Sequence, residues 1–251
     1  MSIKERILSS CTKCNEEGFL RDTDGVDCIP CTCLLKFRAY NRLAHGGFSV
    51  STLDYVTDNN YNIPNIDSGS EYLDYFFKNP FEVEKEGLGL YIYSKERGRG
   101  KTTLTHKLMF ELVKIFFDKT FYVSEREYAF ENVEEFIASF KYGIDDEDLK
   151  WKKTWYVLDD LGNEDGSAKW KKQSTVSSLQ RMLHYRRDHK LPIIITSNHE
   201  PGDLSKLYNK DLDSLLEIKG DGTLGGMLYR AVNVGGAEDL RFSEENSKWN
   251  I

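Results

Sequence analysis

The sequence predicts an α/β protein with a parallel sheet flanked by helices, preceded by a small cysteine-rich module. From Gly87 onward, short apolar stretches alternate with longer amphipathic ones, as strands and helices alternate in parallel sheets. All five cysteines lie between Cys11 and Cys33, and the rest of the chain has none. The two patterns divide the chain into a small N-terminal part and a large C-terminal one.

The elements of the large part can be assigned in order. Leucines and a phenylalanine recur every four residues after Lys101, which predicts a helix over 101–118. Further helical stretches are expected over 125–140 and 173–189. Apolar runs predict strands over 88–94, 120–124, 154–158 and 192–198.

Three zones follow from this assignment. We expect a cysteine module at residues 1–40, which ends in a helix, and a linker with one short helix at 41–86. The α/β domain then occupies 87–251. The last fifty residues are short and mixed in character, which leaves little or no room for a C-terminal helical lid.

Composition limits the cellular compartment and the partners that can be expected for the protein. Charged residues make up 30% of the chain and the formal net charge is −7, so bulk charge does not draw it to nucleic acid. Apolar runs are far shorter than the roughly 20 residues that cross a bilayer. We therefore expect a cytoplasmic protein without a membrane partner. One segment, 168–190, is basic, which suits either a nucleic-acid track or a solvated helix face.

A phosphate-binding loop is predicted between the strand at 88–94 and the helix that follows. The stretch SKERGRGKTTL places Gly98 and Gly100 where the backbone N–H groups must turn inward around phosphates. Lys101 can reach the β- and γ-phosphates of ATP, and Thr102 can ligate Mg²⁺. The strict pattern has glycine where this chain has Lys95. The candidate nucleotide-binding residues are Lys95, Glu96, Arg97, Gly98, Arg99, Gly100, Lys101, Thr102 and Thr103.

Polar residues follow two other predicted strands. WYVLDDLG delivers Asp159 at a strand end, where it can hold Mg²⁺, and Asp160 is placed to orient or deprotonate a water. PIIITSN ends in Asn198, whose amide could contact the γ-phosphate or that water. Paired acids and a terminal asparagine also occur in ordinary turns, but here they accompany a phosphate loop.

The cysteines have the spacing of a structural zinc site. Cys11-x2-Cys14 and Cys28-x2-Cys31 form two pairs, and Gly18 and Gly25 between them suit a small hairpin. Cys33 is surplus, so Cys31-x-Cys33 is an alternative second pair. A redox dithiol or incidental thiols are the competing interpretations.

The order of these motifs resembles the DnaC/DnaI-type replicative helicase loaders among the AAA+ ATPases, over roughly residues 86–242. Gly98–Thr103 match the family's Walker A loop, Asp159 and Asp160 match Walker B, and Asn198 matches sensor 1. Arg186 matches the basic residue before the sensor strand. Many phage proteins of this type also begin with a cysteine module.

The resemblance implies further roles. In MLYRAVNVGGAEDLRF, Arg230 matches an arginine that reaches the ATP of a neighbouring subunit, whereas a second family arginine falls on Gly226. Loaders of this type have a reduced lid and need a partner subunit to close the site. We therefore expect a weak ATPase that is stimulated by its partner or by single-stranded DNA.

The resemblance also implies partners. A hexameric replicative helicase would bind the cysteine module, and the protein would assemble with itself on that helicase. Single-stranded DNA would contact Lys169, Trp170, Lys171 and Lys172 on a loop beside the ATP site, although Trp170 could equally pack against the sheet. The alternatives are an ATPase subunit of a transposase, a P-loop small-molecule kinase, and a nucleotide-binding scaffold without turnover.

Overall fold

The computed structural model of the protein describes residues 3–9, 11–21, 28–57, 64–120, 126–141, 149–163, 169–200, 203–208 and 229–235. The chain divides into two units. One comprises Met1–Tyr61 with His106–Glu125, and the other comprises Asn62–Thr105 with Arg126–Ile251. Helix α6 (Lys101–Thr120) begins in the second unit and ends in the first.

The first unit contains the cysteine module and a small helical assembly. Its elements are α1 (Ile3–Ser9), β1 (Phe19–Arg21), β2 (Cys28–Pro30), α2 (Thr32–His45) and α3 (Val50–Thr57). Strands β1 and β2 pair antiparallel, as the glycine-bearing segment between the cysteine pairs predicted. Asp54 on α3 joins the helices, because it accepts a 2.8 Å hydrogen bond from the Tyr40 hydroxyl and pairs with Arg6.

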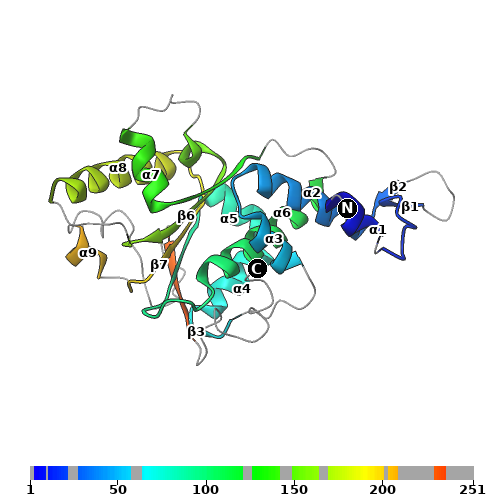
Figure 1. Ribbon diagram of the computed structural model, residues 1–251, viewed down its shortest axis with the longest axis horizontal. Helices are drawn as coiled ribbons and strands as arrows, with labels where there is room; N and C mark the ends of the chain where they lie inside the picture. The colour runs from blue at the N-terminus through cyan, green and yellow to red at the C-terminus, as the bar shows by residue number, and fades with distance from the viewer. Residues whose placement is uncertain are drawn as a thin grey trace. The chain divides into compact units, whose positions relative to one another are not determined.

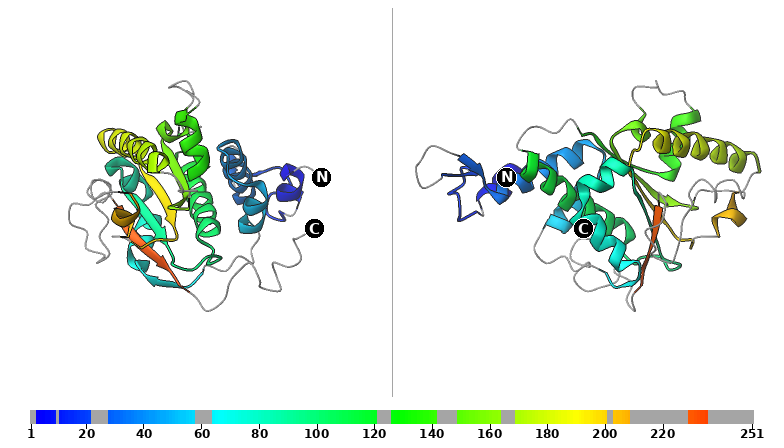
Figure 2. Two further views of the ribbon diagram at one scale, coloured as in Figure 1. Left: turned by 60° about the vertical axis from the view of Figure 1, so that its left-hand side comes forward. Right: turned by 180° about the vertical axis from the view of Figure 1, so that it is seen from behind.

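The second unit is built on a six-stranded sheet. Its strands are β3 (Ile66–Ser68), β4 (Gly89–Tyr93), β5 (Tyr128–Asn132), β6 (Trp155–Leu161), β7 (Ile193–Ser197) and β8 (Tyr229–Val234). Their order across the sheet is β3-β8-β4-β7-β6-β5, and only β3 is antiparallel to its neighbour. The pairing of β4 with β8 can be followed in Figure 2. This confirms the predicted parallel α/β sheet.

Helices cover both faces of this sheet. They are α4 (Ser70–Lys78), α5 (Pro80–Glu86), α7 (Val133–Lys141), α8 (Lys169–Asp188) and the short α9 (Leu204–Leu207), with a 3₁₀ turn η1 at Lys150–Lys152. Neighbouring residues of β6 face opposite ways. Trp155 contacts Phe76 of α4, whereas Tyr156 lies in a core cluster with residues of α7 and α8. Helices α7 and α8 lie side by side (Figure 1). None of the described helices combines the length and apolar character that crossing a membrane requires.

Two local predictions were wrong. The helix expected over 125–140 begins only at Val133, because residues 128–132 form β5. Asn132 marks the boundary: its side-chain oxygen accepts the backbone N–H of Glu135 at 2.8 Å and caps the helix. The segment expected to hold one helix contains α3, α4 and α5. The strand expected over 120–124 lies largely outside the described residues.

Candidate nucleotide site and metal site

The loop between β4 and α6 has the backbone that a phosphate loop needs. Gly98 and Gly100 both have a φ of 77°, in the left-handed region that glycine adopts without a steric penalty. The carbonyl of Gly100 accepts the backbone N–H of Leu104 at 2.7 Å, which starts α6. Lys101 is therefore the first helical residue, at the positive end of the helix dipole.

The lysine in place of the first glycine fits this loop. Among the described residues, positive φ angles outside glycine occur at Asn15, Glu16, Asp160 and Lys190, so Lys95 has an ordinary backbone. Its ammonium group lies 3.0 Å from the carboxylate of Glu200, and both side chains are largely exposed. This surface ion pair contributes little to stability.

The phosphate loop and β6 meet through Thr102 and Asp159. The Thr102 hydroxyl lies 3.0 Å from both carboxylate oxygens of Asp159, and the Thr196 hydroxyl donates to one of them at 2.6 Å. Asp159 is buried, and this burial raises its pKa above the ordinary value despite these hydrogen bonds. A hydroxyl and a carboxylate at this separation could bind one hard cation together, so the residues present fit Mg²⁺.

Asp160 has a strained backbone. Its φ is 63°, which a non-glycine residue rarely adopts, and its N–H donates to the Thr196 hydroxyl at 2.9 Å. The register between β6 and β7 shifts between Leu158 and Leu161. Such an irregularity re-aims a side chain.

Asn198 connects the phosphate loop to Asp160. It directly follows β7, the strand that lies between β4 and β6. Its amide oxygen accepts a hydrogen bond from Lys101 at 2.8 Å, and its amide nitrogen donates to Asp160 at 3.0 Å. Residues from three separate parts of the sequence therefore meet at the carboxyl ends of neighbouring strands.

The remaining loop residues contact Asn163 or one another. Arg97 donates to the side-chain oxygen of Asn163 at 2.8 Å. Glu96 pairs with Arg99, and the Nη1 atom of Arg99 is buried without a hydrogen-bond partner among the described residues. A buried donor without an acceptor costs about 1–3 kcal/mol, and an anion would supply one. Thr103 is half-buried in the first turn of α6.

Sequence reasoning missed three neighbours of the site. Thr196 bonds to Asp159 and to the backbone of Asp160, and Asn163 donates to Asp160 at 2.8 Å. A polar residue in the apolar run PIIITSN was the available signal for Thr196. Gly162 allows a close approach, because a Cβ atom there would lie 2.5 Å from the His199 ring.

The basic residues divide into different environments. Arg186 is fully buried and donates to the backbone carbonyls of Trp151, Lys153, Thr154 and Pro192. It therefore belongs to the interior and not to a charged surface. Residues 169–172 were expected on a loop but form the start of α8, and their side chains lie outside the described residues.

Arg230 is placed by its backbone alone. It lies in β8 opposite Leu90 of β4, and its side chain lies outside the described residues, as Gly226 does entirely.

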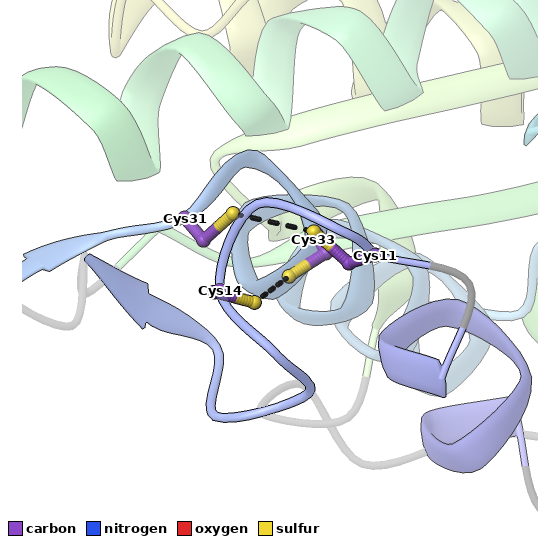
Figure 3. Close-up of side chains that lie close together, drawn as sticks. All are labelled: Cys11, Cys14, Cys31 and Cys33. Atoms are coloured by element: carbon purple, nitrogen blue, oxygen red, sulfur yellow. Dashed lines mark hydrogen bonds between the residues drawn. The ribbon is translucent and has the colours of Figure 1, made fainter.

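Four thiols converge in the cysteine module. The sulfur atoms of Cys11, Cys14, Cys31 and Cys33 all lie within 4.8 Å of one another (Figure 3). Cys11 and Cys31 are 3.6 Å apart and Cys14 and Cys33 are 3.4 Å apart, too far for a disulfide bond. Tetrahedral zinc with Zn–S bonds of about 2.3 Å separates its sulfurs by about 3.8 Å. The donor set therefore fits zinc.

Among the described side chains, the converging thiols include those of Cys31 and Cys33, the Cys31-x-Cys33 pair that the sequence offered as an alternative. Cys31 immediately precedes α2 and Cys33 lies in its first turn, so the helix start directs both thiols to one point. Cys28 belongs to β2, and its side chain lies outside the described residues.

Local hydrogen bonds suit thiolate ligands. The backbone N–H of Gly18 donates to the sulfur of Cys14 at 3.3 Å. Backbone N–H groups of Cys14 and Lys13 lower the pKa of Cys11 to about 6, whereas burial raises that of Cys33. The thiolate, and not the thiol, binds metal.

Comparisons with known proteins support the fold. The sequence matches no protein-family model and no curated protein. A crystal structure of DnaI aligns with a TM-score of 0.51 at 20% identity, over 73% of this chain and 89% of that one. A structure of the DnaC helicase loader aligns with a TM-score of 0.50 at 20% identity, over 70% of this chain and 95% of that one. DnaA from Aquifex aeolicus, bound to AMPPCP, aligns with a TM-score of 0.47 at 19% identity, over 71% of this chain and 49% of that one. The chain thus shares the fold of DnaI and of the DnaC helicase loader.

Proposed function

We propose that the protein is an ATP-dependent loader that binds a replicative helicase and places it on single-stranded DNA, with ATP binding and hydrolysis controlling helicase release. The observation that carries this proposal is the hydrogen-bonded cluster of Lys101, Thr102, Asp159, Asp160 and Asn198. It stands on a fold shared with the DnaC helicase loader.

Each member of the cluster has a role in nucleotide chemistry. The N–H groups around Gly98 and Gly100 and the ammonium of Lys101 bind phosphate. Thr102 and Asp159 would hold Mg²⁺, which would neutralise phosphate charge. Asp160 accepts a proton from water, and Asn198 orients that water.

The site would be completed by a second copy of the chain. Arg230 of a neighbouring subunit would stabilise the transition state, an effect worth about 10³–10⁵-fold where an arginine is supplied in this way. The isolated protein would therefore hydrolyse ATP weakly, and self-assembly on the helicase would raise the rate.

The other zones complete the proposal. Residues 1–40, folded around zinc by Cys11, Cys14, Cys31 and Cys33, would dock on the helicase. Residues 41–86 connect them to the ATPase domain at 87–251. Lys169, Trp170, Lys171 and Lys172, at the start of α8, would bind single-stranded DNA through phosphate contacts and stacking. Such a role places the protein in the cytoplasm.

The decisive experiment is a loading assay. Wild-type protein, a candidate hexameric helicase and a circular single-stranded DNA would be mixed with ATP, and helicase on the DNA would be counted after gel filtration. We expect wild type to increase loading and Lys101→Ala to lose it, with Lys114→Ala as a lysine control on the same helix. An absence of any complex with the helicase in every nucleotide state would contradict the proposal.

The same preparation separates the other P-loop classes. A small-molecule kinase would transfer the γ-phosphate of ATP to nucleosides without regard to DNA. A loader would instead release inorganic phosphate, faster with single-stranded DNA. A transposase subunit would show neither helicase binding nor loading.

A further inference from the structure

The carboxylate of Asp160 is held by two side-chain amides. Asn198 donates from Nδ2 to one oxygen at 3.0 Å, and Asn163 donates from Nδ2 to the other at 2.8 Å. Each bond fixes the direction of the carboxylate and occupies one of its lone pairs.

Each amide is in turn held by a cation of the phosphate loop. Lys101 donates to the amide oxygen of Asn198 at 2.8 Å, and Arg97 donates to that of Asn163 at 2.8 Å. Two series of hydrogen bonds, one through Asn198 and one through Asn163, therefore connect the phosphate loop to the carboxylate of Asp160. The cations also fix the amide orientations, because the reverse would set NH₂ groups against cations and amide oxygens against a carboxylate.

The position of Asn163 suits this task. Its backbone N–H donates to the carbonyl of Asp160 at 3.1 Å, so a turn brings its side chain back to the residue that it contacts. Asp160 has the strained φ of 63°, and such a residue keeps its conformation only where its surroundings hold it. Asn163 is exposed, so its side chain has no place in the core.

We propose that Asn163 is a positioning residue that, together with Asn198, restrains Asp160 until phosphate draws Arg97 and Lys101 away from the two amides; this rests on the proposed ATPase function. A phosphate oxygen is a stronger acceptor for these cations than a neutral amide oxygen. Once the cations move, the amides can turn and the carboxylate is released. Asp160 then accepts the proton that water loses as its oxygen bonds to the γ-phosphorus and ADP departs.

The first test compares turnover with nucleotide affinity in the full-length protein. We expect Asn163→Ala to raise the basal kcat for ATP by about 2- to 10-fold, the equivalent of one hydrogen bond. The Kd for AMPPNP, measured by calorimetry, should stay within about twofold, because Asn163 is not a phosphate ligand. Asn65→Ala is the matched control, since Asn65 also donates to an aspartate, Asp67 at 3.2 Å, outside the site.

A second set of variants tests the route. Arg97→Ala should raise kcat in the wild-type background but not in Asn163→Ala, because Arg97 acts on turnover through Asn163. Asp160→Asn should abolish the increase in either variant. Additive effects of Arg97→Ala and Asn163→Ala on kcat would overturn the relay.

A direct readout does not depend on turnover. In ¹⁵N-labelled protein, the side-chain amide signals of Asn163 are identified by their absence in Asn163→Ala. We expect them to shift when inorganic triphosphate is added, and signals that stay fixed while triphosphate binds would overturn the proposal. An unchanged or lowered kcat in Asn163→Ala would overturn the proposal that Asn163 restrains Asp160, but not the proposed ATPase function. A wild type that neither binds AMPPNP nor hydrolyses ATP would overturn the proposed function and the restraint with it.

Discussion

The hydroxyl of Thr102 lies 3.0 Å from both carboxylate oxygens of Asp159, although the two residues are 57 positions apart. Thr102 is placed by the phosphate loop and Asp159 by β6, and β7 lies between β4 and β6 in the sheet. The contact past the end of β7 shows that the phosphate loop and the end of β6 meet at the carboxyl ends of the parallel strands.

This contact predicts a metal-dependent effect of Thr102→Val. The substitution removes the hydroxyl ligand and keeps the shape of the side chain. We expect the affinity for ATP in the presence of Mg²⁺ to fall about 10- to 100-fold, while the affinity in EDTA changes little. Calorimetry with and without Mg²⁺ measures both values. Thr52→Val, on α3 and outside the phosphate loop, is the control. An equal loss of affinity with and without Mg²⁺ would contradict the assignment.

The order of strand, glycine-rich loop, helix and acid-bearing strand was enough to predict that Thr102 and Asp159 lie close together. Parallel strands place their carboxyl ends at one edge, so residues that follow such strands meet without further information. The roles of Asn163 and Arg186 were not predictable in this way. Asn163 depends on the strained turn at Asp160, and Arg186 depends on carbonyls from two separate segments, 151–154 and Pro192.

Strand β5 was mistaken for a helix because the contact that identifies it is also distant in sequence. Residues 128–132 are YAFEN, and their charged and aromatic residues continue into the amphipathic stretch of α7 without a glycine or proline. Glu131 lies within the stretch that was expected to be helical. In the structure it is buried and accepts a hydrogen bond from Tyr156 at 2.6 Å, a partner in β6 that sequence periodicity does not show.

Glu131 gives the protein a predictable dependence of stability on pH. Burial raises its pKa above the ordinary 4.5, opposed by the hydrogen bond from Tyr156 and by Lys150. The folded state therefore binds this proton more tightly than the unfolded state. The free energy of unfolding should fall as pH rises from 4.5 through the folded pKa, and the loss persists above it.

Substitution of Glu131 by glutamine should remove this dependence. The amide oxygen of the introduced glutamine can still accept the Tyr156 hydroxyl, so Glu131→Gln should be more stable than wild type at about pH 8, above the folded pKa. Urea unfolding at several pH values measures the difference. Glu134→Gln, exposed on α7, controls for the loss of one negative charge. A wild type whose stability rises between about pH 5 and 8 relative to Glu131→Gln would contradict the sign.

The cysteine cluster predicts which thiols hold metal. The purified protein should contain one zinc ion per chain, measured by mass spectrometry of the metal. Cys14→Ser and Cys33→Ser should each lose it, because a closed four-thiolate site tolerates no missing ligand. Cys28→Ser should retain it, since the other four sulfurs already converge. Loss of zinc in Cys28→Ser with retention in Cys33→Ser would instead support the Cys28-x2-Cys31 pair.

Arg186 predicts a large stability effect without a role in DNA binding. Its guanidinium group bonds to four backbone carbonyls, which lie in η1, between η1 and β6, and directly before β7. The guanidinium carbon lies 5.4 Å from the centre of the Tyr156 ring. Arg186→Met leaves these buried acceptors without a donor. We expect it to lower the free energy of unfolding by about 3–5 kcal/mol, measured by urea titration. Arg187→Met, one residue along on the exposed face, should change it by no more than about 0.5 kcal/mol. If both substitutions lowered the free energy of unfolding by a similar small amount, Arg186 would be a surface residue. It would then belong with the exposed basic residues of segment 168–190.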